Sequence, residues 1–401
     1  MIENNGKSRV LAWCAHAAAI LAMVGCATPS APPRTGEVSF DQAVAGATDD
    51  LFNQTQKLPG FLAQVEAKIN RRVLVIDPVI DAASGQQTAV SNMVEQRVAE
   101  RVRAKHAQFD ILPFQPASLS RAQYLLTGTF TRVTRGGASN PFQLNLALTE
   151  LKSGVVVAHA SALARDDGLD TNPTPYYRDS PVLVKDKVVD GYVRTSETAV
   201  GKLADAAYIE RVYTATLINE ATNAYNGERY QEALTLYRNA LATPAGEQLR
   251  VLNGLYLAHW KLGHAGEAEQ AFGRIVAFGL ANNTLGIKFL FRPGSTDFWT
   301  DPKVSGPYAL WLRQIARQTA AAKACMKVIG HTSRTGAEDI NDRLSQQRAM
   351  VIKQRLDAEV PELAGRIQVL GMGFRENLVG TGTDDARDAL DRRVEFKIVG
   401  C

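Results

Sequence analysis

The sequence predicts a chain of mixed α/β and α structure, in which two α/β regions flank a helical segment. Three observations lead to this fold class. The β-branched run Arg72 to Ile80 precedes a segment, Ser91 to His106, whose apolar residues recur at helical spacing. Alanine and aromatic residues in the middle of the chain repeat at a fixed interval. From Ile287 to Val399, strand and helix patterns alternate.

Residues 1–25 have the layout of a secretory signal. Lys7 and Arg9 precede an apolar run, Val10 to Val24, which is shorter than the ~20 residues needed to span a bilayer. The run ends in Met-Val-Gly-Cys, which resembles the bacterial lipobox. That resemblance implies that Cys26 carries a diacylglyceryl group and becomes the first residue of the mature chain. The alternative is an ordinary signal followed by an unrelated cysteine.

The lipid anchor is expected to sit in the outer membrane, with the chain facing the periplasm. Ala27 follows Cys26, whereas lipoproteins that the inner membrane retains have Asp at this place. Residues 26–36 are rich in Pro, Ser and Thr and contain almost no large apolar side chain. Such a segment predicts a flexible tether between the anchor and the first folded region.

Composition supports several folded domains and argues against a nucleic-acid partner. Removal of the signal from the 401 residues leaves roughly 375, which suggests two or three domains, and 45% hydrophobic content is enough for real cores. The formal net charge of +4 becomes +3 when Lys7, Arg9 and Glu3 are removed (+4 − 2 + 1). A charge this small, spread evenly along the chain, does not indicate nucleic-acid binding.

Residues 37–210 are predicted to form one α/β domain. Around the helix Ser91 to His106, the pattern predicts strands at Arg72–Ile80, Phe109–Pro113, Tyr124–Val133, Phe142–Leu151 and Val155–Leu163. The last three, separated by glycine-containing turns, are typical of an antiparallel meander.

The order of these segments carries a family resemblance. VLVIDPVIDAASGQQT, followed by a helix and then by FDILPF and YLLTGTF, resembles periplasmic domains of the CsgG, FlgO and LpoB type. Relatives of this kind assemble secretion channels or flagellar accessory structures, or activate peptidoglycan synthases. The resemblance therefore implies a domain that binds proteins and is not an enzyme.

A long polar segment, Arg165 to Arg194, closes this domain. It holds Asp166, Asp167 and Asp170 together with three prolines. We expect a solvated loop. The alternative, a calcium site, lacks the ligand spacing and the terminal Glu of an EF-hand loop.

Residues 211–284 are expected to be helical. Ala233 and Ala268 lie 35 residues apart (268 − 233), as do Tyr237 and Phe272 (272 − 237). This interval, with small and aromatic residues at these places, resembles a pair of tetratricopeptide-like hairpins. A plain helical connector is the alternative. Two repeats are too few for an independent solenoid, so we expect them to pack on the C-terminal domain.

Residues 285–401 are predicted to form a small α/β sandwich. The expected order is strand, helix, strand, helix and two strands, at Ile287–Phe291, Pro307–Lys323, Cys325–Gly330, Asp339–Ala358, Ile367–Gly371 and Val394–Val399.

The second of these helices carries a polar stripe inside its apolar face. At roughly 100° per residue, the apolar residues that border the stripe are Ile340, Leu344 and Val351 on one side and Ala349, Ile352 and Leu356 on the other. Asn341, Ser345 and Arg348 fall between them. Burial of such groups without partners would cost several kcal/mol, so we expect the stripe to face a ligand, a cavity or water.

Several spaced motifs in this region carry a second and more specific resemblance. They are GHTSRTG at 330–336, Asn341, Leu344-Ser345, Arg348-Ala349, GMG at 371–373 and ALDRRVEF at 389–396. In this order they resemble the OmpA-like peptidoglycan-associated domain. The resemblance implies a βαβαββ sandwich whose pocket holds the diaminopimelate side chain of an uncrosslinked stem peptide without a covalent bond.

Diaminopimelate ends in an ammonium and a carboxylate on one carbon, which suggests roles for the polar residues. Arg348 is expected to bind the carboxylate in bidentate fashion, with Asn341 beside it, because a guanidinium presents a planar fork of donors. A salt bridge from Arg348 to Asp342 or Glu338 is the alternative role.

The loop before this helix supplies His331, Thr332 and Ser333 to the same expected site. His331 is expected to end a strand and to shape the pocket. The family's usual Asp, which would meet the ligand ammonium, is Ser333 here, and a hydroxyl accepts a hydrogen bond without supplying a countercharge. The ligand would then bind more weakly or differ in amidation or residue type, unless Glu338 or Asp339 compensates.

Two further features follow from the resemblance. Arg392 and Arg393 are expected to be secondary contacts of the ligand. They follow Asp391, which stands where the family has Asn. Cys325 starts one strand and Cys401 follows another, and in the family's sheet these strands are antiparallel near neighbours. This implies a Cys325–Cys401 disulfide in an oxidising periplasm, with two free thiols as the alternative.

No pattern indicates an enzyme. The six histidines lie in different segments without a Cys or carboxylate at metal-ligand spacing, and neither a G-x-S-x-G elbow nor a phosphate-binding glycine loop occurs. We therefore expect no cofactor and no metal. The first hypothesis is an outer-membrane lipoprotein that binds peptidoglycan through its C-terminal domain. The second is an assembly or regulatory factor for a secretion, flagellar or peptidoglycan-synthesis complex, which acts on an unknown envelope protein through residues 37–210.

Overall fold

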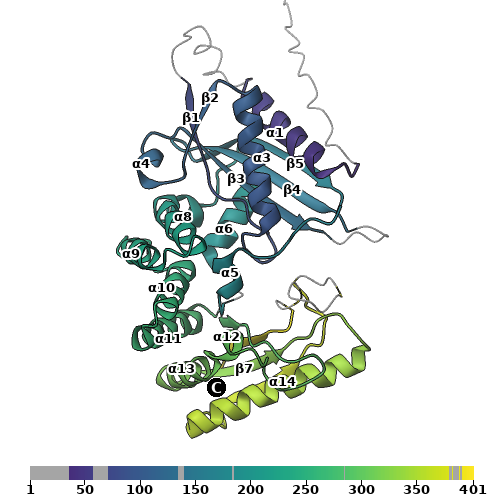
Figure 1. Ribbon diagram of the computed structural model, residues 1–401, viewed down its shortest axis with the longest axis vertical. Coiled ribbons are helices and arrows are strands. Elements are labelled where there is room, and N and C mark those ends of the chain that lie inside the picture. Colours follow the sequence, from purple (N-terminus) through teal and green to yellow (C-terminus); the bar gives the residue numbers. More distant parts are fainter. Residues whose placement is uncertain are drawn as a thin grey trace, which may run out of the picture. The chain divides into compact units, whose positions relative to one another are not determined.

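The computed structural model describes residues 36–56, 71–133, 140–182, 185–283, 285–378, 382, 388 and 391–401 (Figure 1). The expected signal segment, Cys26 and all of the expected tether except Gly36 lie outside these residues. In the described part of the chain, no helix has the length and apolar character needed to cross a membrane. Contacts join Arg34–Cys401 into a single unit.

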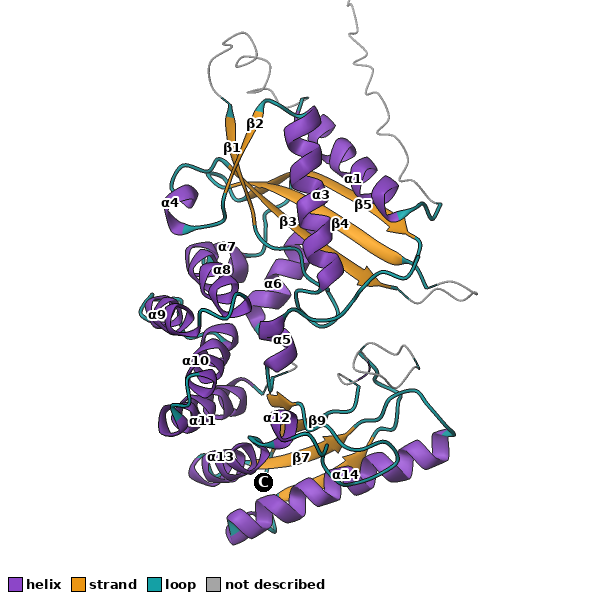
Figure 2. Ribbon diagram, viewed as in Figure 1, coloured by secondary structure: helices purple, strands orange, loops and turns teal. Residues whose placement is uncertain are grey.

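The first α/β region contains a sheet with both parallel and antiparallel strands (Figure 2). Its strands lie in the order β2-β1-β3-β4-β5 and are β1 (Arg72–Ile76), β2 (Phe109–Leu112), β3 (Tyr124–Arg132), β4 (Phe142–Glu150) and β5 (Val155–Ala164). β1 is parallel to both β2 and β3. β3, β4 and β5 form the antiparallel meander that the sequence predicted. The helix α3 (Ala89–Lys105) is the crossover that a parallel β1–β2 pair requires.

Helices pack on both faces of this sheet. α1 (Phe40–Thr55) and α3 pack on one face, and the other is covered by α6 (Lys187–Ser196), α7 (Ala206–Ile209) and the start of α8 (Val212–Asn226) (Figure 2). Successive residues of β3 serve the two faces, because Leu126 packs with the first group and Leu125 with the second. Burial on both faces explains why the central strands are continuous apolar runs in the sequence.

The strand expected at Arg72–Ile80 ends earlier, at Ile76. Pro78 has no N–H to donate to a sheet ladder, so the regular strand stops before it. Asp77 is buried beside it and accepts a hydrogen bond from the Tyr208 hydroxyl of α7 at 2.5 Å. Ile80 then returns to the sheet through an isolated bridge.

The segment Arg165–Arg194 is not the solvated loop that we expected. It contains α5 (Pro175–Asp179) and most of α6. Tyr176 on α5 is 1% exposed, and its hydroxyl donates to a backbone carbonyl at 2.7 Å. The carboxylate of Asp186 accepts hydrogen bonds from two N–H groups in the first turn of α6. Proline and aspartate, which suggested a loop, therefore begin short helices in this segment.

Two helical hairpins follow. They consist of α8, α9 (Tyr230–Leu241), α10 (Leu249–Lys261) and α11 (Ala265–Asn282), each packed on its neighbour in the chain. The residues that repeat in the sequence, Ala233, Tyr237, Ala268 and Phe272, are fully buried. Tyr237 packs directly on Gly254, where an added Cβ would lie 2.3 Å from the ring. The tetratricopeptide-like interpretation stays a prediction.

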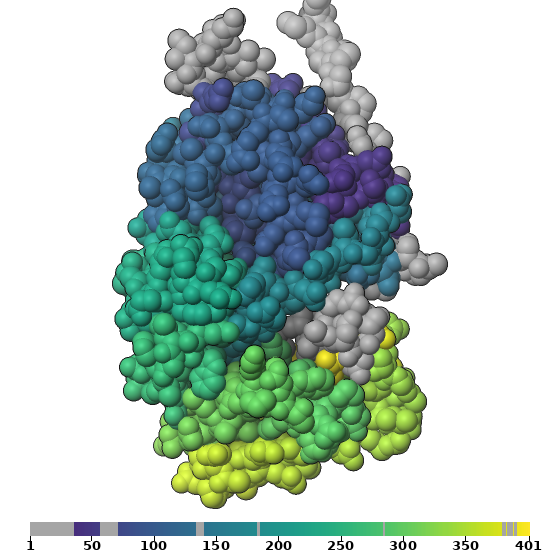
Figure 3. All heavy atoms as spheres, viewed as in Figure 1, coloured from purple at the N-terminus to yellow at the C-terminus, as the bar shows by residue number. Residues whose placement is uncertain are grey.

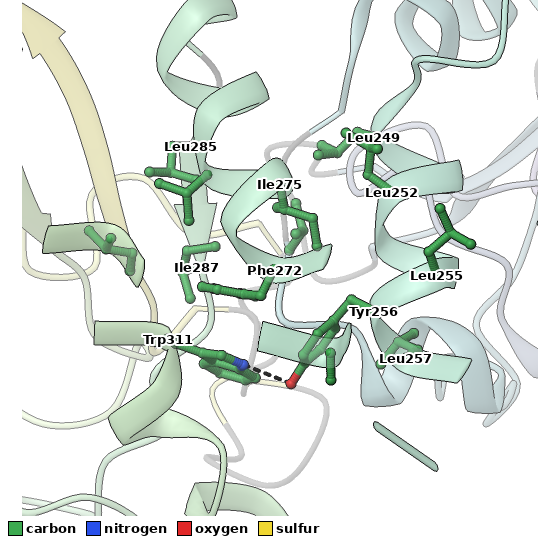
Figure 4. Packing of buried hydrophobic residues seen from close by; sticks show 14 of the residues in the cluster. Leu249, Leu252, Leu255, Tyr256, Leu257, Phe272, Ile275, Leu285, Ile287 and Trp311 are labelled. Atoms are coloured by element: carbon green, nitrogen blue, oxygen red, sulfur yellow. Dashed lines mark hydrogen bonds between the residues drawn. The ribbon is translucent and has the colours of Figure 1, made fainter. Parts of the chain in front are cut away.

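The hairpins share one hydrophobic core with the C-terminal region. Phe272 on α11 stacks on Trp311 of α13 (Tyr308–Ala321), with ring centroids 5.5 Å apart. The Trp311 indole donates to the Tyr256 hydroxyl at 2.7 Å, and Leu285 and Ile287 lie nearby (Figure 4). In the space-filling view, the teal-green residues of the hairpins lie against the green residues that begin the C-terminal region (Figure 3). The hairpins therefore pack on the C-terminal domain, as we expected.

The C-terminal region is a sheet on which α13 and α14 (Glu338–Glu359) pack. Its strands lie in the order β6-β9-β7-β8 and are β6 (Leu285–Ile287), β7 (Cys325–Gly330), β8 (Ile367–Gly371) and β9 (Val394–Val399). β7 is parallel to β8 and antiparallel to β9. Along the chain the order is β6, α13, β7, α14, β8 and β9. The short helix α12 (Pro302–Ser305) precedes α13, and the 3₁₀ turn η1 (Pro361–Leu363) follows α14. The first region contains one further short helix, α4 (Pro116–Leu119).

The strand expected at Ile287–Phe291 is shorter than the sequence suggested. β6 ends at Ile287, although Phe289 and Phe291 are fully buried. Phe291 pairs with Phe298 in an isolated bridge, so the chain turns back on itself here. The alternating apolar residues fill the core from an irregular segment, and alternation alone could not distinguish this from a strand.

Two glycines allow the backbone of α14 to lie directly against the ends of β7 and β8. Gly330 ends β7, Gly371 ends β8, and the two are paired in register. A Cβ on Gly330 would lie 2.2 Å from the Ser345 carbonyl oxygen, and a Cβ on Gly371 would lie 2.5 Å from the Gln346 nitrogen. Both contacts involve backbone atoms, which cannot move aside as the end of a side chain can. The glycines therefore set the distance between the sheet and α14.

A disulfide joins Cys325 to Cys401, with Cα atoms 5.2 Å apart. Cys325 faces Val399 across the β7–β9 ladder, so the antiparallel pairing brings the C-terminal residue back to the start of β7. This is the pairing that the family resemblance implied. The bond links residues separated by 76 positions and thereby restricts the unfolded chain.

We predict that Gly330→Ala lowers the free energy of unfolding by about 1–3 kcal/mol, because the added methyl group would force α14 away from the sheet. Urea denaturation followed by circular dichroism measures the change. Gly365→Ala is the matched control, since a Cβ at that position meets no atom within 4 Å. Equal stability of the two variants would contradict this account of the crossing.

Candidate functional site

The polar residues selected from the sequence converge where β7 and β8 end beneath α14. His331, Thr332 and Ser333 follow β7 directly and are 1%, 2% and 4% exposed. The N–H of His331 donates to the carbonyl of Arg393 at 3.0 Å, and the N–H of Thr332 donates to that of Gly373 at 2.9 Å. These bonds fix the loop both to the start of β9 and to the segment after β8.

The polar stripe of α14 is buried. Asn341, Ser345 and Arg348 are 4%, 0% and 2% exposed. The Asn341 amide donates to two carbonyls of the preceding loop at 2.7 and 3.1 Å, and the Ser345 hydroxyl accepts a hydrogen bond from the N–H of Gly373 at 2.9 Å. One border of the stripe was predicted wrongly. Ile340 is 55% exposed, because residues 336–340 all lie at the surface where the helix begins.

Arg348 is held in a defined orientation. Its Nε donates to the carbonyl of Ser295 at 3.1 Å, and its Nη2 donates to the carbonyl of Arg292 at 3.1 Å. The guanidinium carbon lies 5.0 Å from the centre of the Phe291 ring. These three contacts come from the segment between β6 and α12, which our sequence analysis did not connect with the site. Backbone carbonyls carry no side-chain signature, so no motif could have identified two of these contacts.

The acids that we considered as alternative partners of Arg348 contact a different arginine. Arg375 Nη1 lies 3.2 Å from a carboxylate oxygen of Glu338 and 2.7 Å from one of Asp342. The side chains of these three residues are between 41% and 63% exposed, so their ion pairs are screened by water.

Ser333, which stands where the family has Asp, is buried close to the site, whereas the candidate countercharges are exposed. Asp339 pairs with Arg343 at 2.9 Å, and its side chain is 67% exposed. Glu338 is equally exposed and contacts Arg375. Charges this close to bulk water act weakly on a buried ammonium.

His331 lies between two carboxylates and an arginine. Its Nδ1 is 4.0 Å from Glu376, and its Nε2 is 3.8 Å from Glu395. The Arg393 Nε donates to Glu395 at 2.6 Å. Burial, followed by the charge of Arg393, lowers the pKa of His331 to about 4, so the imidazole is neutral at pH 7. Arg392 is also buried, at 4% exposure.

The stripe of α14 and its loop concentrate hydrogen-bond donors, most of which bond within the domain. The two Asn341 amide N–H groups donate to loop carbonyls, and the Ser345 hydroxyl donates to the carbonyl of Asp342 at 2.9 Å. The Thr332 hydroxyl is buried and has no hydrogen-bond partner among the described residues. Buried polar groups normally have partners, and an unpaired one at a cluster of donors is consistent with a ligand.

The match to a known family falls on this region. The model of the OmpA family matches residues 290–390, which include β7, α14, β8 and the loop 331–333. Residues 290–390 are an OmpA family domain.

Two curated proteins are similar to part of the chain. Probable lipoprotein YiaD of Escherichia coli (strain K12) is 37% identical over 76 residues, which cover 19% of this chain and 34% of that protein. Outer membrane protein A of Shimwellia blattae is 35% identical over 82 residues, which cover 18% of this chain and 33% of that protein. The chain thus spans about a third of the length of these relatives.

Among solved structures, the peptidoglycan-associated lipoprotein from Burkholderia pseudomallei is 20% identical, with a TM-score of 0.24. The matched part covers 29% of this chain and 90% of that one.

A second candidate site lies outside the OmpA family domain, in the first α/β region. A cleft of about 640 Å³ opens at the carboxyl ends of β1 and β2, between α3 and α8. In open α/β sheets, ligands commonly bind at this edge. Its lining is rich in amide side chains, which are Gln87, Asn92, Gln96, Asn219, Asn223 and Asn226. The sequence did not reveal this site, because its residues come from helices more than a hundred positions apart.

Two acids beside this cleft have raised pKa values. Burial raises the pKa of Asp77 to about 6, although the hydrogen bond from Tyr208 acts in the opposite direction. Burial, and then the charge of Asp77, raise the pKa of Glu95 to about 7. Glu95 lines the cleft itself.

We predict that Asp77→Asn gains stability relative to wild type as the pH rises from 4 to 7. In the folded protein Asp77 keeps its proton up to a pH of about 6, whereas in the unfolded chain it loses it near 3.8. The folded state therefore binds more protons between these values, and wild-type stability falls as the pH rises through them. The Asn side chain does not titrate, and its carbonyl can still accept from Tyr208.

Urea unfolding at pH 4, 5.5 and 7 tests this prediction. The difference in free energy of unfolding between variant and wild type should change by roughly 2–3 kcal/mol in favour of the variant. Asp50→Asn, at an exposed position, controls for the loss of one charge. A difference that is independent of pH would contradict the raised pKa of Asp77.

Proposed function

We propose that this protein binds peptidoglycan without a covalent bond, through a domain of residues 285–401 that contains the OmpA family match. The observation that carries the proposal is the buried polar stripe of α14, with Arg348 at its centre, beside the loop 331–333. Arg348 is 2% exposed, and the hydroxyl of Thr332 in that loop is buried with no hydrogen-bond partner among the described residues, as expected where a polar ligand completes a site.

The ligand would be the diaminopimelate side chain of an uncrosslinked stem peptide. Its carboxylate would contact the guanidinium of Arg348. Because the bonds to the Ser295 and Arg292 carbonyls already orient the guanidinium, little rotamer entropy is lost when the ligand binds. The Thr332 hydroxyl would supply a further hydrogen bond, Asn341 would hold the loop in place through its bonds to Thr335 and Ala337, and Arg392 and Arg393 would act at a greater distance.

Ser333 would limit how strongly the site binds the ligand ammonium. A hydroxyl can accept a hydrogen bond from the ligand ammonium, but it provides no opposite charge. Hydrogen bonds between charged partners are about twice as strong as neutral ones. We therefore infer weaker binding than an Asp at this position would give, or a preference for a ligand whose terminus is altered.

The rest of the chain would place this domain in the periplasm. Residues 1–25 would direct export, Cys26 would anchor the chain in the outer membrane, and residues 26–36 would form the tether. The disulfide between Cys325 and Cys401 supports an oxidising compartment. The tetratricopeptide-like hairpins of residues 211–284 would join the wall-binding domain to residues 37–210.

We predict that Arg348→Ala reduces pull-down of the protein by purified peptidoglycan at least tenfold, because it removes the carboxylate-binding fork. Arg343→Ala is the matched control, since Arg343 lies on the same helix and pairs with Asp339 at the surface. Circular dichroism checks that both variants fold. Pull-down of Arg348→Ala equal to that of the control would remove Arg348 from the site.

Ser333→Asp, in the same assay, restores the acid that the family carries. Pull-down should rise several-fold, because the ammonium would gain a charged partner. No gain over wild type would mean that residue 333 does not face the ammonium.

The cleft beside α3 favours a second role, for residues 37–210, in binding an envelope protein. Side-chain amides both donate and accept, so the lining suits the backbone and polar side chains of a protein partner. This would make the chain an assembly or regulatory factor, for which wall binding supplies the position.

Photo-crosslinking tests this second role. We predict that a crosslinker placed at Gln96, which lines the cleft, captures a defined envelope protein in living cells. The same crosslinker at Arg274, on the exposed side of α11, should not capture it. Identical products from both positions would argue against a binding site in the cleft.

A further inference from the structure

One imidazole and two carboxylates meet at the edge of the OmpA family domain. One ligand atom each from His331, Glu376 and Glu395 lies within 4.8 Å of the others. The three residues come from the loop after β7, the turn after β8 and strand β9. No spacing in the sequence brings them together, which is why our search for metal-binding patterns did not find them.

The imidazole of His331 lacks the partners that a buried polar group needs. It is 1% exposed, and neither ring nitrogen has a hydrogen-bond partner among the described residues. The distances of 4.0 Å from Nδ1 to Glu376 and 3.8 Å from Nε2 to Glu395 are too long for hydrogen bonds. The group is aimed at two carboxylates without bonding to either.

Tautomerism cannot satisfy both nitrogens. A neutral imidazole has one N–H and one lone pair, and each nitrogen faces a carboxylate oxygen. In either tautomer, one lone pair is therefore directed at a negative oxygen. A cation placed between that lone pair and the carboxylate oxygen would remove this repulsion.

We propose that His331, Glu376 and Glu395 form a binding site for a divalent transition-metal ion, with Zn²⁺ as the best fit. One imidazole nitrogen and two carboxylate oxygens suit zinc, whereas Mg²⁺ and Ca²⁺ prefer oxygen ligands alone. Three protein ligands leave a fourth position for water or another ligand.

The geometry allows the ligands to close on an ion. Zinc binds nitrogen and oxygen at about 2.0–2.2 Å, so the three ligand atoms must approach each other by roughly 1 Å. Glu376 can make this movement, because its side chain is 53% exposed on a turn. The turn itself is held by Arg393, whose Nη2 donates to the Glu376 carbonyl at 3.1 Å.

Arg393 has two opposing effects on the site. Its charge disfavours a cation, but two carboxylates and one guanidinium still leave a net formal charge of −1 (−2 + 1). Its Nε also donates to one oxygen of Glu395 at 2.6 Å, while the other oxygen faces His331. Hydrogen bonds of this kind commonly orient the carboxylates that bind metals. The bound ion would join the turn after β8 to the ends of β7 and β9.

Isothermal titration of the metal-free full-length protein with ZnCl₂ tests the site, after dialysis against EDTA. We expect one equivalent of Zn²⁺ to bind to wild type and to Glu362→Gln, an exposed glutamate elsewhere in the domain. Glu376→Gln and Glu395→Gln should each weaken binding at least tenfold. Wild-type binding no stronger than that of Glu376→Gln would overturn the proposal.

A second measurement tests directly whether the His331 ring binds the metal ion. The ring ¹⁵N resonances of His331, assigned with His331→Gln, should shift when one equivalent of ZnCl₂ is added. Unchanged resonances would overturn the site even if zinc binds elsewhere on the chain. Because both readouts follow the metal and need no peptidoglycan, their failure would leave the wall-binding role of Arg348 untouched, and failure of the pull-down would leave the metal site untouched.

Discussion

The close approach of α14 to the ends of β7 and β8 determines the geometry of the C-terminal domain. Gly330 and Gly371 are neighbours in the sheet, and backbone atoms of residues 345 and 346 occupy the space that their side chains would need. At this separation the Ser345 hydroxyl reaches the N–H of Gly373, and the polar stripe lies directly over the loop that follows β7. A side chain at either glycine would separate the two halves of the candidate site.

A second constraint ties this domain to the helices before it. Phe272, Trp311 and Tyr256 come from three different helices and are joined by ring stacking and one hydrogen bond. Movement of α11 relative to α13 would expose these rings and break that bond, which makes a flexible hinge at this point costly. We therefore infer that the hairpins and the C-terminal domain move as one body.

The two proposed sites differ in the charge of the groups that surround them. Around Arg348 the contacts described above are two backbone carbonyls and the Phe291 ring, which orient a cationic side chain that suits a carboxylate ligand. Around His331 the nearest groups are carboxylates, which suits a cation. Ser333 follows His331 by two positions and carries no charge, whereas two acids lie beside His331.

The sequence alone determined the succession of strands and helices in the C-terminal region and most of the polar stripe, because these depend on periodicity, whereas the pairing of Cys325 with Cys401 was implied by the family resemblance. It also gave the helix α14 and strands β7, β8 and β9 nearly to the residue. It failed where long-range contacts outweigh local pattern. Buried Tyr176 and the capping Asp186 turn an apparent loop into helices, and the irregular segment after β6 supplies Arg348 with backbone carbonyls. The carboxylates at His331 and the amide cleft also required the tertiary structure, since their residues meet only after the strands and helices have packed.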